Sequence, residues 1–201
     1  MLHSLSAEAK LFYCIYYSLL ELLGDDQVDE IFASANLDPF DLTAPHYFRR
    51  GKDLIDSIAA QLLLNFGEET SRGLLIRMGG ASLTFFRKYF SEIAQLGNIE
   101  NRLKPLDRRF LSSLKTLAAV LSSEMGTEIN VNSSDSGCFE WQAFYANSQQ
   151  NPREFIPFFY FGLLEEFCNW LDTRKNYLLN YAPDIINKNF DLITIEIRNL
   201  E

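Results

Sequence analysis

Three glycines interrupt an apolar segment of helical period, and they could make room for a ligand against bare backbone. They are Gly73, Gly79 and Gly80, within Arg72–Phe90. Adjacent glycines inside a helix each cost about 1 kcal/mol relative to alanine, so some structural or functional gain must offset them. A close approach by another helix, space for a ligand, or a local kink would each be such a gain. A phosphate-binding loop is excluded, because the glycines do not lie between a strand and a helix N-terminus.

A run of bulky apolar side chains around a proline and a glycine is a second feature that could line a cavity. It is Phe155–Gly162, which reads FIPFFYFG. The whole chain has 17 Phe and 9 Tyr, and so many aromatic side chains fill a large core, line a ligand cavity or form an interface. The helix expected over Phe155–Leu171 is apolar almost all round, which predicts that it lies between the sheet and another layer.

Nucleophilic catalysis needs a serine or cysteine activated by a neighbouring base, and the sequence shows no such pair. Cys14, Cys138 and Cys168 are widely spaced and are interpreted as buried structural thiols. A zinc site needs about four nitrogen or sulfur ligands, which these cysteines and the two histidines, His3 and His46, do not supply together. We therefore predict neither catalytic residues nor a metal site.

The charge of the chain argues against two classes of partner. With 18 Lys and Arg against 27 Asp and Glu, the formal net charge is -9, so no basic face is expected for nucleic acid or for an anionic membrane. The odd number of cysteines indicates a reducing compartment. Leu11–Leu23 is apolar but contains Glu21 and is shorter than the about 20 residues of a bilayer span. We predict a cytoplasmic protein with no integral membrane segment and, at most, a peripheral membrane association.

The elements that must position these residues follow from hydrophobic periodicity. The expected helices are Ala7–Leu23, Gln27–Ala35, Phe48–Phe66, the glycine-bearing helix that ends near Ala94, Leu106–Met125 and Phe155–Leu171. The expected strands are Thr127–Asn132, Cys138–Tyr145, Tyr177–Tyr181 and Asp191–Ile197. The expected loops are Asn36–Tyr47, Gln95–Lys104 and Ala146–Glu154.

The order of these elements, α-α-α-α-α-β-β-α-β-β, predicts an α+β fold with helices packed on an antiparallel four-stranded sheet. We expect a single domain over residues 1–201, with an N-terminal helical segment at 1–45 and an α+β core at 46–201.

With the elements in this order, the sequence resembles the 4-vinyl-reductase-type domain, a small-molecule-binding domain. The resemblance covers nearly the whole chain. It rests on LGDDQVDEIFASANL (Leu23–Leu37), RGLLIRMGGASLTFF (Arg72–Phe86), LKPLDRRFLSSLKTLAAVLSSEMG (Leu103–Gly126) and FYFGLLEEFCNWLDTRKNYLLNYA (Phe159–Ala182). That domain is similar in fold to TRAPP vesicle-tethering subunits and, more distantly, to haem-based nitric-oxide-sensing domains.

The resemblance implies a homodimer of TRAPP-subunit-like fold with a ligand cavity between helices and sheet. Many members of the family carry cysteines after the hairpin and in the last strands, and their absence here makes a metal-binding role doubtful. Arg77 is present where an arginine is expected, whereas a second frequent arginine is replaced within Met78-Gly79-Gly80. The ligand-binding residues expected are Arg77, Met78, Gly79, Gly80, Leu83, Phe86, Trp141, Phe158, Phe161 and Gly162.

Two functions from different classes remain open at this stage. The first is a non-enzymatic binding module for a lipophilic small molecule. The family name suggests a tetrapyrrole or chlorophyll precursor, and the module would act as a carrier, a sensor or a photosynthetic-complex assembly factor. No cofactor is required for that role. The second is a protein-interaction scaffold of the TRAPP kind whose cavity is filled by side chains. An auxiliary role in an enzyme complex is a third, weaker option.

Overall fold

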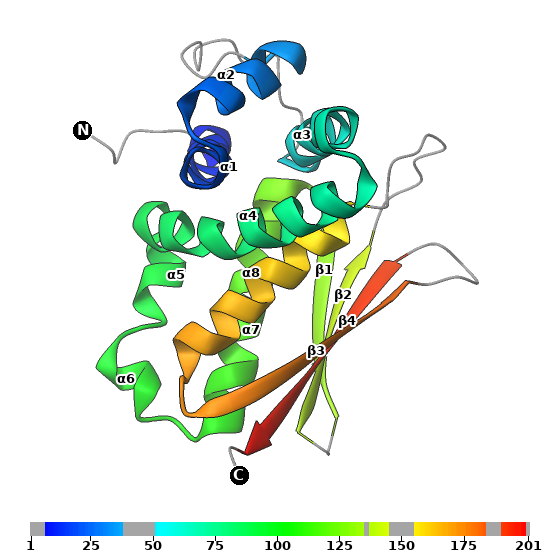
Figure 1. Ribbon diagram of the computed structural model, residues 1–201. Coiled ribbons are helices and arrows are strands. Elements are labelled where there is room, and N and C mark those ends of the chain that lie inside the picture. Colours follow the sequence, from blue (N-terminus) through cyan, green and yellow to red (C-terminus); the bar gives the residue numbers. More distant parts are fainter. Residues whose placement is uncertain (1–6, 38–50, 135–136, 145–154, 184–189, 200–201) are drawn as a thin grey trace.

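The computed structural model describes residues 7–37, 51–134, 137–144, 155–183 and 190–199 (Figure 1). Its helices are α1 (Ala7–Leu23), α2 (Asp25–Ser34), α3 (Gly51–Phe66), α4 (Glu68–Tyr89), α5 (Ser91–Gln95), α6 (Ile99–Arg102), α7 (Leu106–Met125) and α8 (Ile156–Leu171). Its strands are β1 (Glu128–Ser133), β2 (Cys138–Phe144), β3 (Lys175–Pro183) and β4 (Phe190–Asn199). None of the helices described is both long and apolar enough to cross a membrane.

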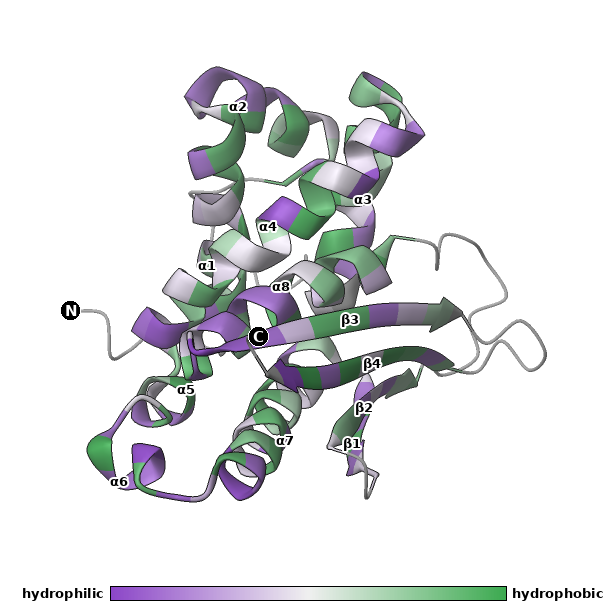
Figure 2. Ribbon diagram, turned by 60° about the horizontal axis from the view of Figure 1, so that its bottom comes forward, coloured by the Kyte–Doolittle hydropathy of each residue, from purple (hydrophilic) through white to green (hydrophobic). Residues whose placement is uncertain are grey.

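The four strands form one antiparallel sheet in the order β1-β2-β4-β3. The register places Trp141 of β2 between Val131 of β1 and Ile193 of β4. Burial alternates along β1 and β2, so one face of these strands packs on the helices and the other is more exposed. Figure 2 shows alternating hydrophobic and hydrophilic bands along β4. The α+β fold with a four-stranded antiparallel sheet, predicted from the element order, is confirmed.

Helix α8 is the middle layer of the molecule. On one side it contacts the sheet: the rings of Tyr160 and Trp141 lie 6.0 Å apart between centroids, as do those of Phe158 and Tyr181. Helix α4 packs against α8 from outside the sheet (Figure 1). The prediction that this apolar helix lies between the sheet and another layer is therefore confirmed.

The backbones of α4 and α8 touch at two glycines. A Cβ atom on Gly79 would overlap the backbone carbonyl of Phe159, and a Cβ atom on Gly162 would overlap that of Ile76. At Gly80 a Cβ atom would lie 3.5 Å from the carbonyl oxygen of Gly162, which is ordinary van der Waals distance. Of the gains considered for these glycines, a close approach by another helix is what the structure shows at Gly79. The approaching helix belongs to the same chain.

The N-terminal helices form a further layer on α4. Figure 1 shows α1, α2 and α3 together at one end of the molecule, where α1 and α3 contact α4. At the start of α3, a Cβ atom on Gly51 would overlap the side chain of Leu11 and lie 2.9 Å from the carbonyl oxygen of Glu124. Helices α1, α3 and α7 therefore also meet in close contact.

A buried ion pair joins α7 to the end of α8. Nη2 of Arg109 donates to Oδ2 of Asp172 at 3.1 Å, and the two side chains are 7% and 4% exposed. Arg109 also donates to the carbonyl oxygens of Arg102 at 3.2 Å and Leu171 at 3.4 Å. The exposed Arg174 binds the same carboxylate through Nε and Nη2. Hydrogen bonds from Arg174 and the charge of Arg109 hold the pKa of Asp172 well below its usual range, although burial opposes them.

Most predicted elements are confirmed within one to three residues at their ends. The predicted bounds match those of α1 and α7. The strands β3 and β4 are longer than the predicted segments. The predicted loop Ala146–Glu154 and most of Asn36–Tyr47 lie outside the described residues, as do both histidines.

Two predictions about the region after α4 are wrong. The helix expected to run to about Ala94 ends at Tyr89, because Phe90 takes an extended conformation with φ -112° and ψ 107°, and α5 then begins. The segment expected to be a polar loop contains α6, so in the described part of the chain seven helices precede the hairpin, where five were expected. Nδ2 of Asn101 holds α6 in place by donating to the carbonyl oxygen of Leu96 at 2.8 Å and to Oγ of Ser113 at 3.2 Å.

The contact between α4 and α8 predicts opposite effects for alanine at two glycines of α4. Gly79→Ala should lower the free energy of unfolding by about 2 kcal/mol or more, because the new methyl group meets backbone that cannot move aside. Gly73→Ala, where no atom lies within 4 Å of the new Cβ, should raise it by up to about 1 kcal/mol. Urea denaturation of both variants tests this, and equal effects at the two positions would contradict the close packing.

The buried ion pair predicts a pH-dependent loss of stability. Asp172→Asn should lower the free energy of unfolding at pH 7 by about 3 kcal/mol or more, because it leaves Arg109 buried without its counter-charge. Since the pKa of Asp172 is depressed in the folded state, this advantage of wild type holds above the unfolded value of 3.8 and shrinks as the pH falls below it. The measurement is urea denaturation at pH 7 and at about pH 3. Glu165→Gln, which neutralises an exposed carboxylate of α8, is the control. A difference that does not change with pH would show that the charge of Asp172 is not responsible.

Candidate functional site

The predicted site residues on α4 divide between the interior and the surface. Met78 and Phe86 are completely buried, and Leu83 is almost so. Gly79 is covered by the backbone of α8. Arg77, which was expected to meet an anionic group of the ligand, is exposed.

The remaining predicted residues lie on α8 and β2. Gly162 is in backbone contact with α4, and Phe161 is half-buried. Phe158 is half-buried between Tyr181 and the guanidinium of Arg72, which lies 5.3 Å from its ring centroid. Trp141 is buried on the helix-facing side of the sheet. The structure therefore brings Gly79 and Gly162 together, but it places Trp141 on the sheet side of α8.

Two buried residues whose rings are in contact between α8 and the sheet carry hydrogen-bond donors. They are Trp141, with its indole N–H, and Tyr160, with its hydroxyl, and each residue is 1% exposed. The indole N–H has no hydrogen-bond partner in the described part of the chain, and the hydroxyl lies near the side chain of Thr127 without a hydrogen bond of good geometry. A buried donor without a partner costs about 1–3 kcal/mol in stability. Two such donors within one apolar layer therefore require a structural or functional explanation.

The electrostatic surroundings of Tyr160 favour a neutral binding partner. Burial raises the pKa of its hydroxyl, hydrogen bonding with the side chain of Thr127 lowers it, and the charges of Asp56 and Asp191 raise it further. The hydroxyl therefore stays protonated and is able to donate. A neutral acceptor such as a carbonyl or ether oxygen suits the position better than a carboxylate, because Asp56 and Asp191 would repel a negative charge.

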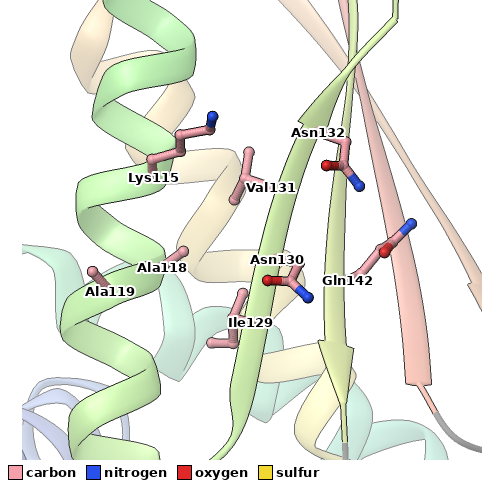
Figure 3. A pocket seen from close by; sticks show the side chains of 8 residues that line it. All are labelled: Lys115, Ala118, Ala119, Ile129, Asn130, Val131, Asn132 and Gln142. Atoms are coloured by element: carbon pink, nitrogen blue, oxygen red, sulfur yellow. The ribbon is translucent and has the colours of Figure 1, made fainter.

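Three surface hollows are lined by described residues, and none of the ten predicted site residues lines them. One, of about 380 Å³, lies between α7 and the strands β1 and β2. Figure 3 shows Lys115, Ala118 and Ala119 on α7 facing Ile129 and Val131 on β1. The other two, of about 530 and 300 Å³, adjoin each other where α6, α7, α8 and β3 meet.

Some residues with functional potential were not identified as site residues from the sequence. Tyr160 was part of the aromatic run, and its signal was a single hydroxyl within an otherwise apolar stretch. Arg109 and Asp172 are 63 positions apart, so no local spacing connects them. A charged residue on the apolar face of the helix Leu106–Met125 would have been the available clue.

Two further features bear on catalysis and metal binding: the burial of the cysteines and the absence of a metal-binding cluster among the described residues. Cys14 and Cys168 are completely buried, and burial raises the pKa of both thiols. Both therefore remain protonated at neutral pH and lack nucleophilic character. No group of three or more His, Cys, Asp or Glu side chains that could hold a metal ion occurs among the described residues.

Comparison with solved structures identifies the fold. The chain is similar to a single-residue variant of the T. Tengcongensis H-NOX domain, with a TM-score of 0.65 and 14% identity over 96% of this chain and 98% of that one. It is similar to an Fe(II) H-NOX protein from S. oneidensis, with a TM-score of 0.64 and 11% identity over 96% and 97%. An oxygen-binding H-NOX domain related to soluble guanylate cyclases gives a TM-score of 0.62 and 13% identity over 93% of both chains. No protein-family model matches the sequence, and no curated protein does either.

The chain therefore has the fold of the H-NOX domains. At the level of fold, this confirms the distant resemblance to nitric-oxide-sensing domains. The closer resemblance to 4-vinyl-reductase-type domains and TRAPP subunits stays a prediction.

The unpartnered hydroxyl of Tyr160 predicts an unusual result for the variant Tyr160→Phe. Removing a buried hydroxyl that has no partner should leave the free energy of unfolding of the ligand-free protein unchanged or raise it by about 1 kcal/mol. Urea denaturation measures the difference, and Tyr177→Phe is the matched control. The hydroxyl of Tyr177 donates to the carbonyl oxygen of Asp172 at 2.9 Å, so its removal should destabilise the protein by about 1 kcal/mol. Equal losses at the two tyrosines would mean that Tyr160 has a partner in the free protein.

Proposed function

We propose that this chain is a non-enzymatic module that binds a lipophilic small molecule carrying a neutral hydrogen-bond acceptor. The observation that supports it is the pair of buried donors without a well-aligned acceptor, on Trp141 and Tyr160, in the apolar layer between α8 and the sheet. Apolar walls with a few convergent polar groups are typical of small-molecule sites. The acceptor group of the ligand would satisfy both donors, and opening of the ring contact between them would admit it.

The H-NOX neighbours add support for small-molecule binding as a class. One of them is an oxygen complex, and others were determined to examine distortion of the haem. A tetrapyrrole is therefore a reasonable first ligand for this chain. Its role would be that of a sensor, a carrier or an assembly factor for a tetrapyrrole-containing complex.

The described residues do not fit an iron-bound haem. Haem iron is held by histidine, methionine, tyrosinate or a cysteine thiolate. The described part of the chain has no histidine, its thiols at Cys14 and Cys168 stay protonated, and so does Tyr160. Met78 and Met125 are completely buried. We therefore propose that the described residues bind a metal-free ligand.

A tryptophan fluorescence titration tests the proposal. The chain has two tryptophans, so Trp170→Phe leaves Trp141 as the only one, and binding beside it should change its emission. The probes are protoporphyrin dimethyl ester, which has neutral carbonyl acceptors, and pyrene, which has none. Tyr160→Phe should weaken binding of the ester about ten-fold and leave pyrene unaffected, because one hydrogen bond in an apolar site is worth about 1 to 1.5 kcal/mol.

The control for this titration is Tyr13→Phe, the same chemical change at a half-buried position on α1. It should not affect either probe. If the ester leaves the emission of Trp141 unchanged, or if both tyrosine variants weaken its binding equally, the proposed site is wrong.

A specific observation favours the scaffold as second candidate. Four half-buried aromatic side chains from α1 and α4 form a stacked surface: Tyr13 contacts Tyr17 and Tyr89, and Tyr17 contacts Phe85, with centroids 5.5 to 6.2 Å apart. Aromatic residues are enriched at protein interfaces. Such a surface suits the predicted homodimer or another protein partner, and failure of every ligand in the titration would favour this candidate.

A further inference from the structure

Two adjoining hollows lie at the end of the molecule where α6, the start of α7, the end of α8 and the start of β3 come together (Figure 1). Their volumes are about 530 and 300 Å³, and they share four lining residues. The shared residues are Arg102, Arg109, Asp172 and Arg174. We call this pair the basic hollow.

The charge of the basic hollow is opposite to that of the whole chain. The cationic residues that line the larger part are Arg102, Lys104, Arg109, Arg174 and Lys175, and its one acidic residue is Asp172. The chain as a whole has a formal net charge of -9. A concentration of positive charge in a concave part of an acidic protein is a feature that attracts anions.

Asp172 organises the hollow without neutralising it. Its carboxylate is almost fully buried and accepts hydrogen bonds from Arg174 at 2.9 and 3.0 Å and from Arg109 at 3.1 Å. The two guanidinium groups are thereby fixed in place, and one negative charge is set against them. The side chains of Arg102 and Lys104 are exposed at the rim and have no ion-pair partner among the described residues.

Two further features of the hollow suit an anion. The Nε–H of Arg109 is buried and has no acceptor within the described residues, although the side chain is only 7% exposed. Leu106 lines the larger part and begins α7, whose N-terminus has no side-chain cap. The N-terminus of a helix of this length carries a partial positive charge.

We propose that the basic hollow binds a phosphate group with two or more negative charges, carried by a soluble ligand or by a lipid headgroup. Guanidinium groups bind phosphate oxygens with paired, charge-assisted hydrogen bonds. The volume of the hollow suits such a group. This inference does not depend on the ligand proposed for Trp141 and Tyr160, because the residues of the two sites do not overlap.

The test compares two double variants with the same change of charge. Arg102→Gln with Lys104→Gln removes two exposed cations of the hollow that have no ion-pair partner among the described residues. Arg108→Gln with Lys115→Gln removes two exposed cations of α7 that lie outside it. The soluble probe is inorganic pyrophosphate, measured by titration calorimetry. The lipid probe is a phosphatidylcholine vesicle containing phosphatidic acid, measured by co-sedimentation.

The hollow variant should weaken binding about ten-fold or more, which corresponds to loss of at least one charge-assisted hydrogen bond. The control should bind like wild type, and both should keep its melting temperature. This pattern with pyrophosphate supports a soluble ligand, and the same pattern with vesicles alone supports a lipid headgroup. If both double variants weaken binding equally, the attraction depends on the overall charge and not on the hollow, and the proposal is overturned. Absence of binding to both pyrophosphate and the vesicles would also overturn it.

Discussion

The contact between the backbones of α4 and α8 is the constraint on which the rest of the structure depends. Because Gly79 and Gly162 lack side chains, the two helices approach more closely than any other residue would allow. Helix α8 then lies between α4 and the sheet, while α4 also supports α1 and α3 on its outer side (Figure 1). The two glycines therefore allow α4 and α8, which belong to different layers of the molecule, to pack in direct backbone contact.

The same contact decides where a ligand could bind. It fills the space that Gly79 and Gly162 leave, so no ligand fits between α4 and α8 at this point, and Tyr160 meets Trp141 on the sheet side of α8. The H-NOX domains share this arrangement of helices and strands, but a shared fold does not determine which side chains line a site. Among the described residues, the interior offers buried neutral donors and protonated thiols.

Helices and strands with a long, regular hydrophobic period could be predicted from the sequence, whereas the contacts between them were predicted less well. The helix Leu106–Met125 and the hairpin that follows it were predicted because their apolar residues repeat at 3.6 and 2 residues. Helix α6 was missed because its tertiary hydrogen bonds through Asn101, and not an apolar face, hold it in place. The glycines left three explanations open, and the close approach of α8 at Gly79 depends on the topology, which periodicity does not specify. For the same reason, the pairing of Arg109 with Asp172 could not be predicted from the sequence.

Helix α8 connects the two places where the structure leaves polar groups available for a ligand. Tyr160 lies in its first turns, and Asp172 follows its last residue, so the two are separated by about 18 Å along the helix axis at 1.5 Å per residue. Energetic coupling between two sites requires an element with two arrangements that both ligands influence. A ligand that opened the contact of Tyr160 with Trp141 would move α8 relative to the sheet, whereas the glycine contact resists its movement relative to α4. Motion along or about the axis of α8 would then reach Leu171 and Asp172, which bind Arg109 at the start of α7. Helix α8 thus carries residues of both proposed sites.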